Sequence, residues 1–142
     1  MRTLGLLLFL TLLLTILAQA IYATYCINSS EGTLTIATAE AYISSDGTSG
    51  WCSAESGKKY TTLTYYIGLY YEFSADNKVF DRGYILSLDP TVADILYKKN
   101  KPSGTHESVY SIARSYYSYD GTTWYLDAST GIGATIAGYC II

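Results

Sequence analysis

The chain has few of the residues from which active sites are most often built. Its 142 residues include one histidine, three cysteines and two prolines, and 15% of them are charged. No pair of cysteines has the Cys-x-x-Cys spacing of a zinc site or a redox pair, so we expect no metal site and no cofactor. His106 follows Gly104-Thr105 in a predicted loop, where an exposed histidine without a catalytic role is the simpler interpretation. These absences indicate a protein that is not an enzyme.

Basic residues are also scarce. The net charge is −3, and the longest basic group is Lys98-Lys99-Asn100-Lys101. A mildly acidic surface without a basic cluster argues against binding to nucleic acid or to an anionic membrane surface. After Ala20 the sequence has no glutamine and no methionine, and it holds only three asparagines. Depletion of these thermolabile side chains is typical of proteins from thermophiles.

The N-terminal segment has the three parts of a secretory signal peptide. Arg2 gives a short positive start, residues 4–17 are apolar and uncharged, and Ala18-Gln19-Ala20 places small residues before a cleavage site. We therefore predict a signal peptide over residues 1–20 and a single domain over residues 21–142. The alternative is an uncleaved anchor, for which about 14 apolar residues are short. In that case alone a membrane is expected as a partner, with the domain as an ectodomain of a cell or a virus.

Secretion would place the three cysteines in an oxidising compartment. Cys26, Cys52 and Cys140 allow one bridge and leave one thiol, which we expect to be buried and inert. Cys26 and Cys140 both stand between Tyr and Ile near the two ends of the domain, and this favours their pairing, although the other pairings stay open. Asn28-Ser29-Ser30 is a sequon, so glycans are expected partners, N-linked at Asn28 or O-linked at the abundant hydroxyls.

The hydrophobic pattern is that of β-strands. From Thr62 to Ser74, apolar residues alternate strictly with more polar ones, which predicts a long strand with one buried face. Val79–Leu88 reads as its partner, buried on both faces. Further strands are predicted at residues 21–27, 34–43, 108–119, 123–128 and 132–142. Together they predict an all-β fold, an antiparallel β-sandwich of jelly-roll or immunoglobulin-like outline.

Turns and one helix complete the predicted fold. Asp46-Gly47 and Asp120-Gly121 favour type I′ hairpin turns. A short helix is predicted from Asp89 to Asn100, because Asp89 can cap it, Pro90 suits its first position and two lysines suit its last turn.

The two terminal segments are apolar and carry neither charge nor proline, the usual guards of an edge strand. They must therefore pair within the domain or complete the sheet of a neighbouring subunit, which would produce a homopolymer. The candidate strand-exchange residues are Ile21, Tyr22, Tyr25, Ile27, Ile132, Ile136, Tyr139, Ile141 and Ile142.

The chain resembles secreted surface-filament subunits of hyperthermophilic archaea, and donor-strand pilins in particular. The resemblance lies in the predicted compartment, in the composition rich in Tyr, Thr and Ser, and in the apolar ends. The resemblance implies a structural subunit of an extracellular filament, pilus or surface matrix.

Tyrosine is unusually abundant, with 16 copies. Tyr66 and Tyr70 flank Gly68 on the more polar face of the long strand, where two rings beside a side-chain-free floor would form a platform for stacking sugars. A secreted carbohydrate-binding module is therefore the alternative function, unless these rings pack against a neighbouring strand.

Overall fold

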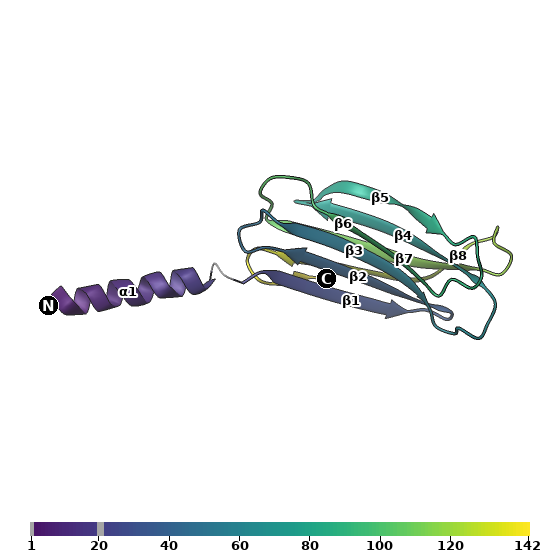
Figure 1. Cartoon of the computed structure of the whole chain (residues 1–142), viewed down its shortest axis with the longest axis horizontal. Helices are drawn as coiled ribbons and strands as arrows, with labels where there is room; N and C mark the ends of the chain where they lie inside the picture. Colours follow the sequence, from purple (N-terminus) through teal and green to yellow (C-terminus); the bar gives the residue numbers. More distant parts are fainter. Residues whose placement is uncertain (1, 20–21) are drawn as a thin grey trace.

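The computed structural model describes residues 2–19 and 22–142, and for residues 12–19 it describes the backbone alone. Within this range the chain forms one helix, α1 (Arg2–Gln19), and a β-sandwich that stands apart from it (Figure 1). The leucines at the start of α1 are exposed. No helix in the described range is both long enough and apolar enough to cross a membrane. The predicted cleavage site after Ala20 lies outside the described residues.

Nine strands build the sandwich from two antiparallel sheets. One sheet has the order β1-β2-β3-β6 and the other the order β5-β4-β7-β8-β9. This confirms the predicted antiparallel β-sandwich. The strand order differs from that of an immunoglobulin domain, because the first three strands are neighbours in one sheet. The bounds are β1 Thr24–Glu31, β2 Thr35–Ile43, β3 Gly50–Lys58, β4 Tyr66–Ala75, β5 Lys78–Leu86, β6 Asp94–Asn100, β7 Ser108–Ser118, β8 Tyr125–Thr135 and β9 Cys140–Ile141.

The core combines the large residues of β4 with small residues on the strands that face it. Ile67, Leu69 and Phe73 are fully buried, as the alternation predicted. The inner faces of β2 and β7 carry mostly alanine and serine. Their short side chains bring the sheets close enough for a serine hydroxyl of one sheet to reach a backbone carbonyl of the other. Ser111 Oγ donates to Ser53 O at 2.7 Å, and Ser115 Oγ donates to Ile36 O at 3.1 Å.

The prediction of a helix from Asp89 to Asn100 is wrong. Asp89 does cap a turn, since the Thr91 amide donates to its Oδ1 at 2.8 Å, but residues 94–100 then form β6 and pair with β3. Ile95 is buried, and the ring of Tyr97 lies 5.8 Å from that of Phe73. A ten-residue helix has little stability of its own, so the ladder and these aromatic contacts outweigh the capping signals.

Two further strand predictions need correction. The sequence did not predict β3, which is rich in small residues rather than in the β-branched and aromatic residues typical of strands. Its pairing with β2 and β6 supplies what its own propensity lacks. β5 is not buried on both faces but lies at a sheet edge, with Tyr84 62% exposed.

The two Asp-Gly turns are not of type I′, which requires a positive φ at both central residues. Gly47 and Gly121 have φ values of 73° and 78°, but neither aspartate has a positive φ. Asp46 instead accepts hydrogen bonds from its own turn, from Ser44 Oγ first and then from the amide and hydroxyl of Thr48, which lower its pKa to about 2. The tight turn with two positive φ values is Asp76-Asn77, between β4 and β5.

Candidate functional site

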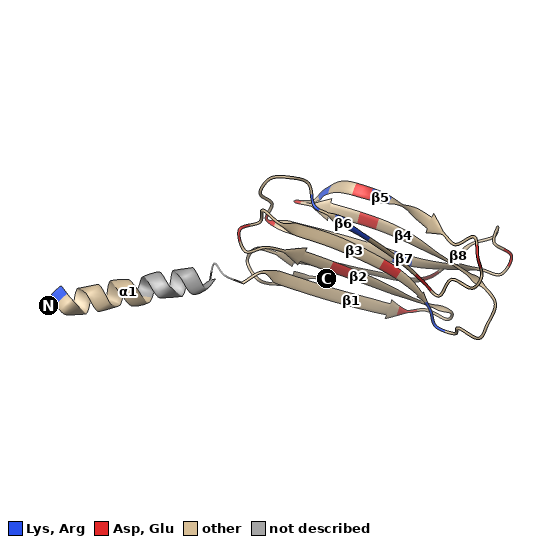
Figure 2. Ribbon diagram, viewed as in Figure 1, with Lys and Arg blue, Asp and Glu red and all other residues tan. Residues whose placement is uncertain are grey.

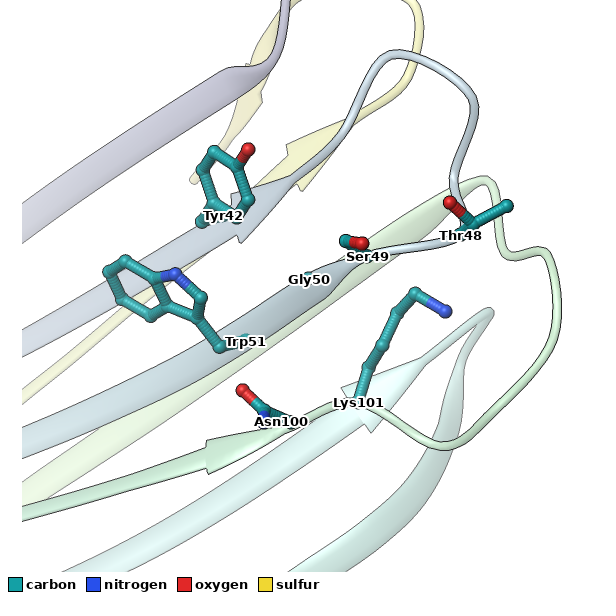
Figure 3. A pocket seen from close by; sticks show the side chains of 7 residues that line it. All are labelled: Tyr42, Thr48, Ser49, Gly50, Trp51, Asn100 and Lys101. Carbon is teal, nitrogen blue, oxygen red and sulfur yellow. The ribbon is translucent and has the colours of Figure 1, made fainter.

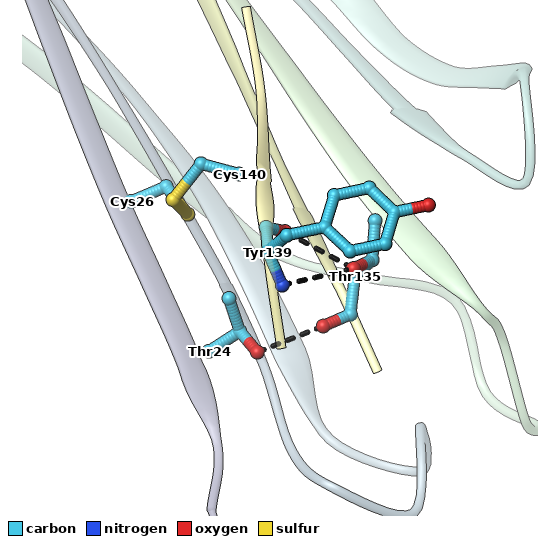
Figure 4. The surroundings of a disulfide bond; sticks show 5 residues. All are labelled: Thr24, Cys26, Thr135, Tyr139 and Cys140. Atoms are coloured by element: carbon cyan, nitrogen blue, oxygen red, sulfur yellow. Dashed lines mark hydrogen bonds between the residues drawn. A yellow bond between two sulfur atoms is a disulfide. The ribbon is translucent and has the colours of Figure 1, made fainter. Parts of the chain in front are cut away.

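The two ends of the domain lie on the same side of the sandwich. Cys26 of β1 and Cys140 of β9 form a disulfide with a Cα–Cα distance of 5.8 Å (Figure 4). This confirms the favoured pairing and indicates an oxidising, extracellular environment. Cys52 is the remaining thiol. It is buried, and burial raises its pKa to about 12, so it is not a nucleophile at neutral pH.

Each terminal segment is paired within the domain, but on one side only. β1 pairs with β2 at the edge of its sheet. The strands predicted over residues 123–128 and 132–142 are divided differently, because one strand, β8, runs from Tyr125 to Thr135, and the chain then turns through Gly138, with φ 96°, into β9. β9 pairs with β8 at Gly133 and Ala134 only.

Side chains hold β1 and the following turn against β8 and β9. We call this side of the sandwich the seam. Thr24 Oγ1 donates to Thr135 O at 2.8 Å, and Asn28 Nδ2 donates to Gly131 O at 3.3 Å. The residue numbers rise along β1 as they fall along β8, so the two strands run antiparallel across the seam. The seam is thus closed by a disulfide and side-chain hydrogen bonds rather than by a backbone ladder.

Asp127 of β8 fastens the far end of the seam. Its carboxylate accepts hydrogen bonds from the amides of Thr33, Leu34 and Thr35 at 2.9, 2.9 and 2.7 Å and from the Thr35 hydroxyl at 2.8 Å. Partial burial alone would raise the pKa of Asp127. The four hydrogen bonds outweigh burial, and the pKa lies below its ordinary value.

The outer side of β1 is an open sheet edge. The Gly32 amide donates to Thr35 O, and hydrogen-bonded and non-bonded pairs alternate along an antiparallel ladder. Every second residue of β1 therefore directs its backbone groups to β2: Thr24, Cys26, Asn28 and Ser30. The other residues of β1 direct theirs to the open edge: Tyr25, Ile27, Ser29 and Glu31. The Ser29 amide agrees with this alternation, since it donates to Asn28 Oδ1 at 3.1 Å rather than to β2.

Charge distinguishes β1 from the edges on the opposite side of the sandwich. β1 carries one charged residue, Glu31, at its end (Figure 2). β5 and β6 carry three each: Lys78, Asp81 and Arg82, and Asp94, Lys98 and Lys99. Charged residues are a common means of preventing edge-to-edge pairing. β5 and β6 are therefore guarded edges, and β1 is an unguarded one.

Most of the predicted strand-exchange residues are exposed, but only two of the exposed ones lie on β1 itself. Tyr25 and Ile27 on β1 are 52% and 54% exposed. Ile132 is the exception, because it is buried in the core, and Ile21 lies outside the described residues. Tyr22, Ile136, Tyr139, Ile141 and Ile142 are also exposed.

An aromatic group lies beside the open edge on the outer face of the same sheet. The rings of Tyr42 and Trp51 stack with centroids 5.8 Å apart, and Tyr25 lies 5.9 Å from Trp51. Lys98 Nζ lies 3.8 Å from the Trp51 ring centroid. Tyr42 and Trp51 also border a shallow depression of about 310 Å³ that continues over Gly50 to Asn100 and Lys101 (Figure 3). Sequence reasoning missed this group because Trp51 belongs to β3, which was not predicted.

Tyr66 and Tyr70 do not flank an open floor. A Cβ added at Gly68 would lie 2.7 Å from Leu86 Cδ2 and 3.2 Å from Trp124 Cζ3, so these side chains cover the position. Tyr66 lies against the Gly121 turn. The ring of Tyr70 lies 4.9 Å from that of Tyr84. The two tyrosines thus pack against their own domain.

No protein-family model matches the chain, and neither a curated protein nor a solved structure shows similarity to it. A proposal of function therefore rests on the geometry of the seam and of the open edge.

Proposed function

We propose that the chain is a secreted, non-enzymatic structural protein that associates with copies of itself by β-strand addition at the open edge of β1. The observation that carries this proposal is the contrast between β1, which is unguarded, and β5 and β6, each with three charges. Strand addition would give the outward backbone groups of Tyr25 and Ile27 partners, whereas the Ser29 amide already donates to Asn28 Oδ1. It would also shelter Tyr25 and Ile27, which the fold leaves half exposed.

The disulfide favours one of two forms of strand addition. Exchange of β1 or β9 into a neighbour would require the Cys26–Cys140 bond to open or to form between subunits. Addition of a neighbour's strand beside β1 leaves the bond intact. We therefore propose edge-to-edge addition rather than strand exchange.

A filament requires two different contact surfaces. Pairing of β1 with β1 of a second copy uses the same surface twice and closes at a dimer. Growth into a homopolymer requires β1 to accept a different segment of the next subunit. We expect a filament that grows by strand addition, and the apolar ends and the low charge of the chain support this expectation.

The test is an edge-charge comparison. Ile27→Lys places a charge on the open edge, while Leu96→Lys places the same charge at an exposed position on β6, which is already guarded. We expect the wild type and Leu96→Lys to form filaments in negative-stain electron micrographs as concentration rises, and Ile27→Lys to stay monomeric in size-exclusion chromatography with light scattering.

Four results would count against the proposal or a part of it. A wild type that stays monomeric at millimolar concentration would overturn it, as would equal association of the two lysine variants. A discrete dimer that grows no further would overturn the homopolymer. Non-reducing electrophoresis of the assembled protein should show single chains, and a ladder of disulfide-linked chains would replace edge addition by strand exchange.

A further inference from the structure

Asn28 lies where the seam meets the open edge of β1. Its Oδ1 accepts the outward amide of Ser29 at 3.1 Å, and its Nδ2 donates to Gly131 O of β8 at 3.3 Å. One carboxamide therefore occupies one of the outward amides near the middle of β1 and also ties β1 to the other sheet. An incoming strand can pair with the Ser29 amide only if it displaces Asn28.

Asn28 is also the acceptor residue of the sequon Asn28-Ser29-Ser30. We propose that Asn28 controls access to the β1 edge: its free carboxamide closes the edge in part, and an N-linked glycan on the same nitrogen closes it fully. This inference rests on the function proposed above and names a regulation of the same site.

The modification is a group transfer from a lipid-linked sugar phosphate or diphosphate. The Asn28 carboxamide nitrogen forms a bond to C1 of the donor sugar as the bond from C1 to the phosphate oxygen breaks. The phosphate leaves with the bonding electron pair, and the nitrogen loses one of its two hydrogens to a base of the transferase. The second hydrogen stays available to donate to Gly131 O. Because Nδ2 is engaged in the seam and Asn28 is half-buried in the folded domain, the transfer must precede closure of the seam.

A glycan at this position conflicts with strand addition for a steric reason. Paired strands lie about 4.8 Å apart, and the carboxamide that would carry the sugar already bonds the amide to which the new strand must pair. A sugar is too bulky for that gap. Glycosylated subunits would therefore stay single or end a growing assembly, whereas unmodified subunits would extend it.

The experiment compares two positions for one glycan. The wild type and two variants are produced in the same host that modifies Asn-x-Ser sequons, and glycopeptide mass spectrometry establishes the occupancy of each. Ser30→Ala removes the sequon and keeps Asn28. Pro102→Ser in the Ser30→Ala background creates a sequon at Asn100, which is exposed at the end of β6 on the opposite side of the sandwich. We expect glycosylated wild type, separated on a lectin column, to need at least a tenfold higher concentration to associate than Ser30→Ala. The protein glycosylated at Asn100 should associate like Ser30→Ala.

A second comparison uses the unmodified chain. Asn28→Ala frees the Ser29 amide, so in a host without N-glycosylation its association threshold should fall several-fold below that of the wild type. Ser30→Ala should leave the threshold unchanged in that host.

The outcomes separate the two proposals. Absence of association in every unmodified variant overturns both. Association of the Asn28 glycoform at the same concentration as Ser30→Ala overturns the inference alone, and so does a host that modifies Asn100 but never Asn28. An unchanged threshold in Asn28→Ala overturns the part assigned to the free carboxamide.

Discussion

The carboxylate of Asp127 accepts both the backbone amide of Thr35, at 2.7 Å, and its hydroxyl, at 2.8 Å, although the two residues lie in different sheets. Together with the amides of Thr33 and Leu34, this contact fixes the β1–β2 turn on β8. The disulfide fixes the other end of β1. The strand proposed to receive a neighbour is thus held at both ends, which limits the entropy lost when a second strand pairs with it.

Asp127→Asn should lower the free energy of unfolding by about 2 kcal/mol, because amides that donate to a charged group lose a strong acceptor. Urea denaturation at pH 7 measures this loss. Glu31→Gln is the matched control, since Glu31 lies near the same turn in an exposed ion pair with Lys59 at 3.2 Å, and such pairs contribute little. Equal losses in the two variants would contradict the role assigned to Asp127.

The same variant should change the response to acid. The pKa of Asp127 is lower in the folded protein than its ordinary value, so the stabilisation is complete at about pH 5, one unit above the unfolded value of about 4, and is lost as pH falls through the folded pKa. The difference in unfolding free energy between wild type and Asp127→Asn should therefore shrink between pH 5 and the acid limit. Denaturation series at several pH values measure it, and a difference that is constant with pH would refute the linkage.

Gly32→Ala should destabilise the same end of the seam. A Cβ at Gly32 would lie 2.5 Å from the backbone oxygen of Asp127, which cannot move without disturbing β8. We expect a loss of about 2 kcal/mol from this overpacking. In a double-mutant cycle the losses from Gly32→Ala and Asp127→Asn should add up to more than the loss in the double variant, because both act on one contact. Strict additivity would mean that the two residues act separately.

Removal of the disulfide with Cys26→Ser and Cys140→Ser should cost about 4 kcal/mol, because the bond closes a loop with a sequence separation of 114 residues. Chemical denaturation with and without a reductant measures the effect. Reductant should lower the stability of the wild type and of Cys52→Ala, and it should leave the double variant unchanged. If reductant had no effect on Cys52→Ala, Cys52 would have to be part of the disulfide, and the Cys26–Cys140 pairing would be wrong.

Close packing of the sheets makes Ser111 a sensitive position. Ser111→Ala removes one hydrogen bond to Ser53 O and should cost about 1 kcal/mol. Ser111→Val adds volume at a fully buried position between the sheets and should cost about 1 to 3 kcal/mol more. Thermal unfolding ranks the variants. A valine variant more stable than the alanine variant would show that the gap between the sheets can accommodate it.

The strands with a clear period could be predicted from the sequence. β4 covers most of the strand predicted from Thr62 to Ser74 and buries Ile67, Leu69 and Phe73 as predicted, because one face of the strand must leave water when a sheet packs on another. The strand begins only at Tyr66, and Leu63 of the predicted buried face is exposed. The matched surroundings of Cys26 and Cys140 also indicated their pairing. Sequence reasoning failed at β3 and β6, where local preference and final structure disagree. Small residues in β3 and capping signals before β6 are local features, and backbone pairing with distant strands outweighs them.

The residues alone determined that residues 21–27 and 132–142 are apolar and uncharged and favour β-structure. Only the tertiary structure decided that β1 keeps one open side, that Asn28 and Asp127 bind across the seam, and that Gly68 lies beneath Trp124 and Leu86. The reason is physical. Hydrophobic periodicity is a property of neighbouring residues in the sequence. Whether an edge strand is paired depends instead on which distant strand the rest of the fold places beside it.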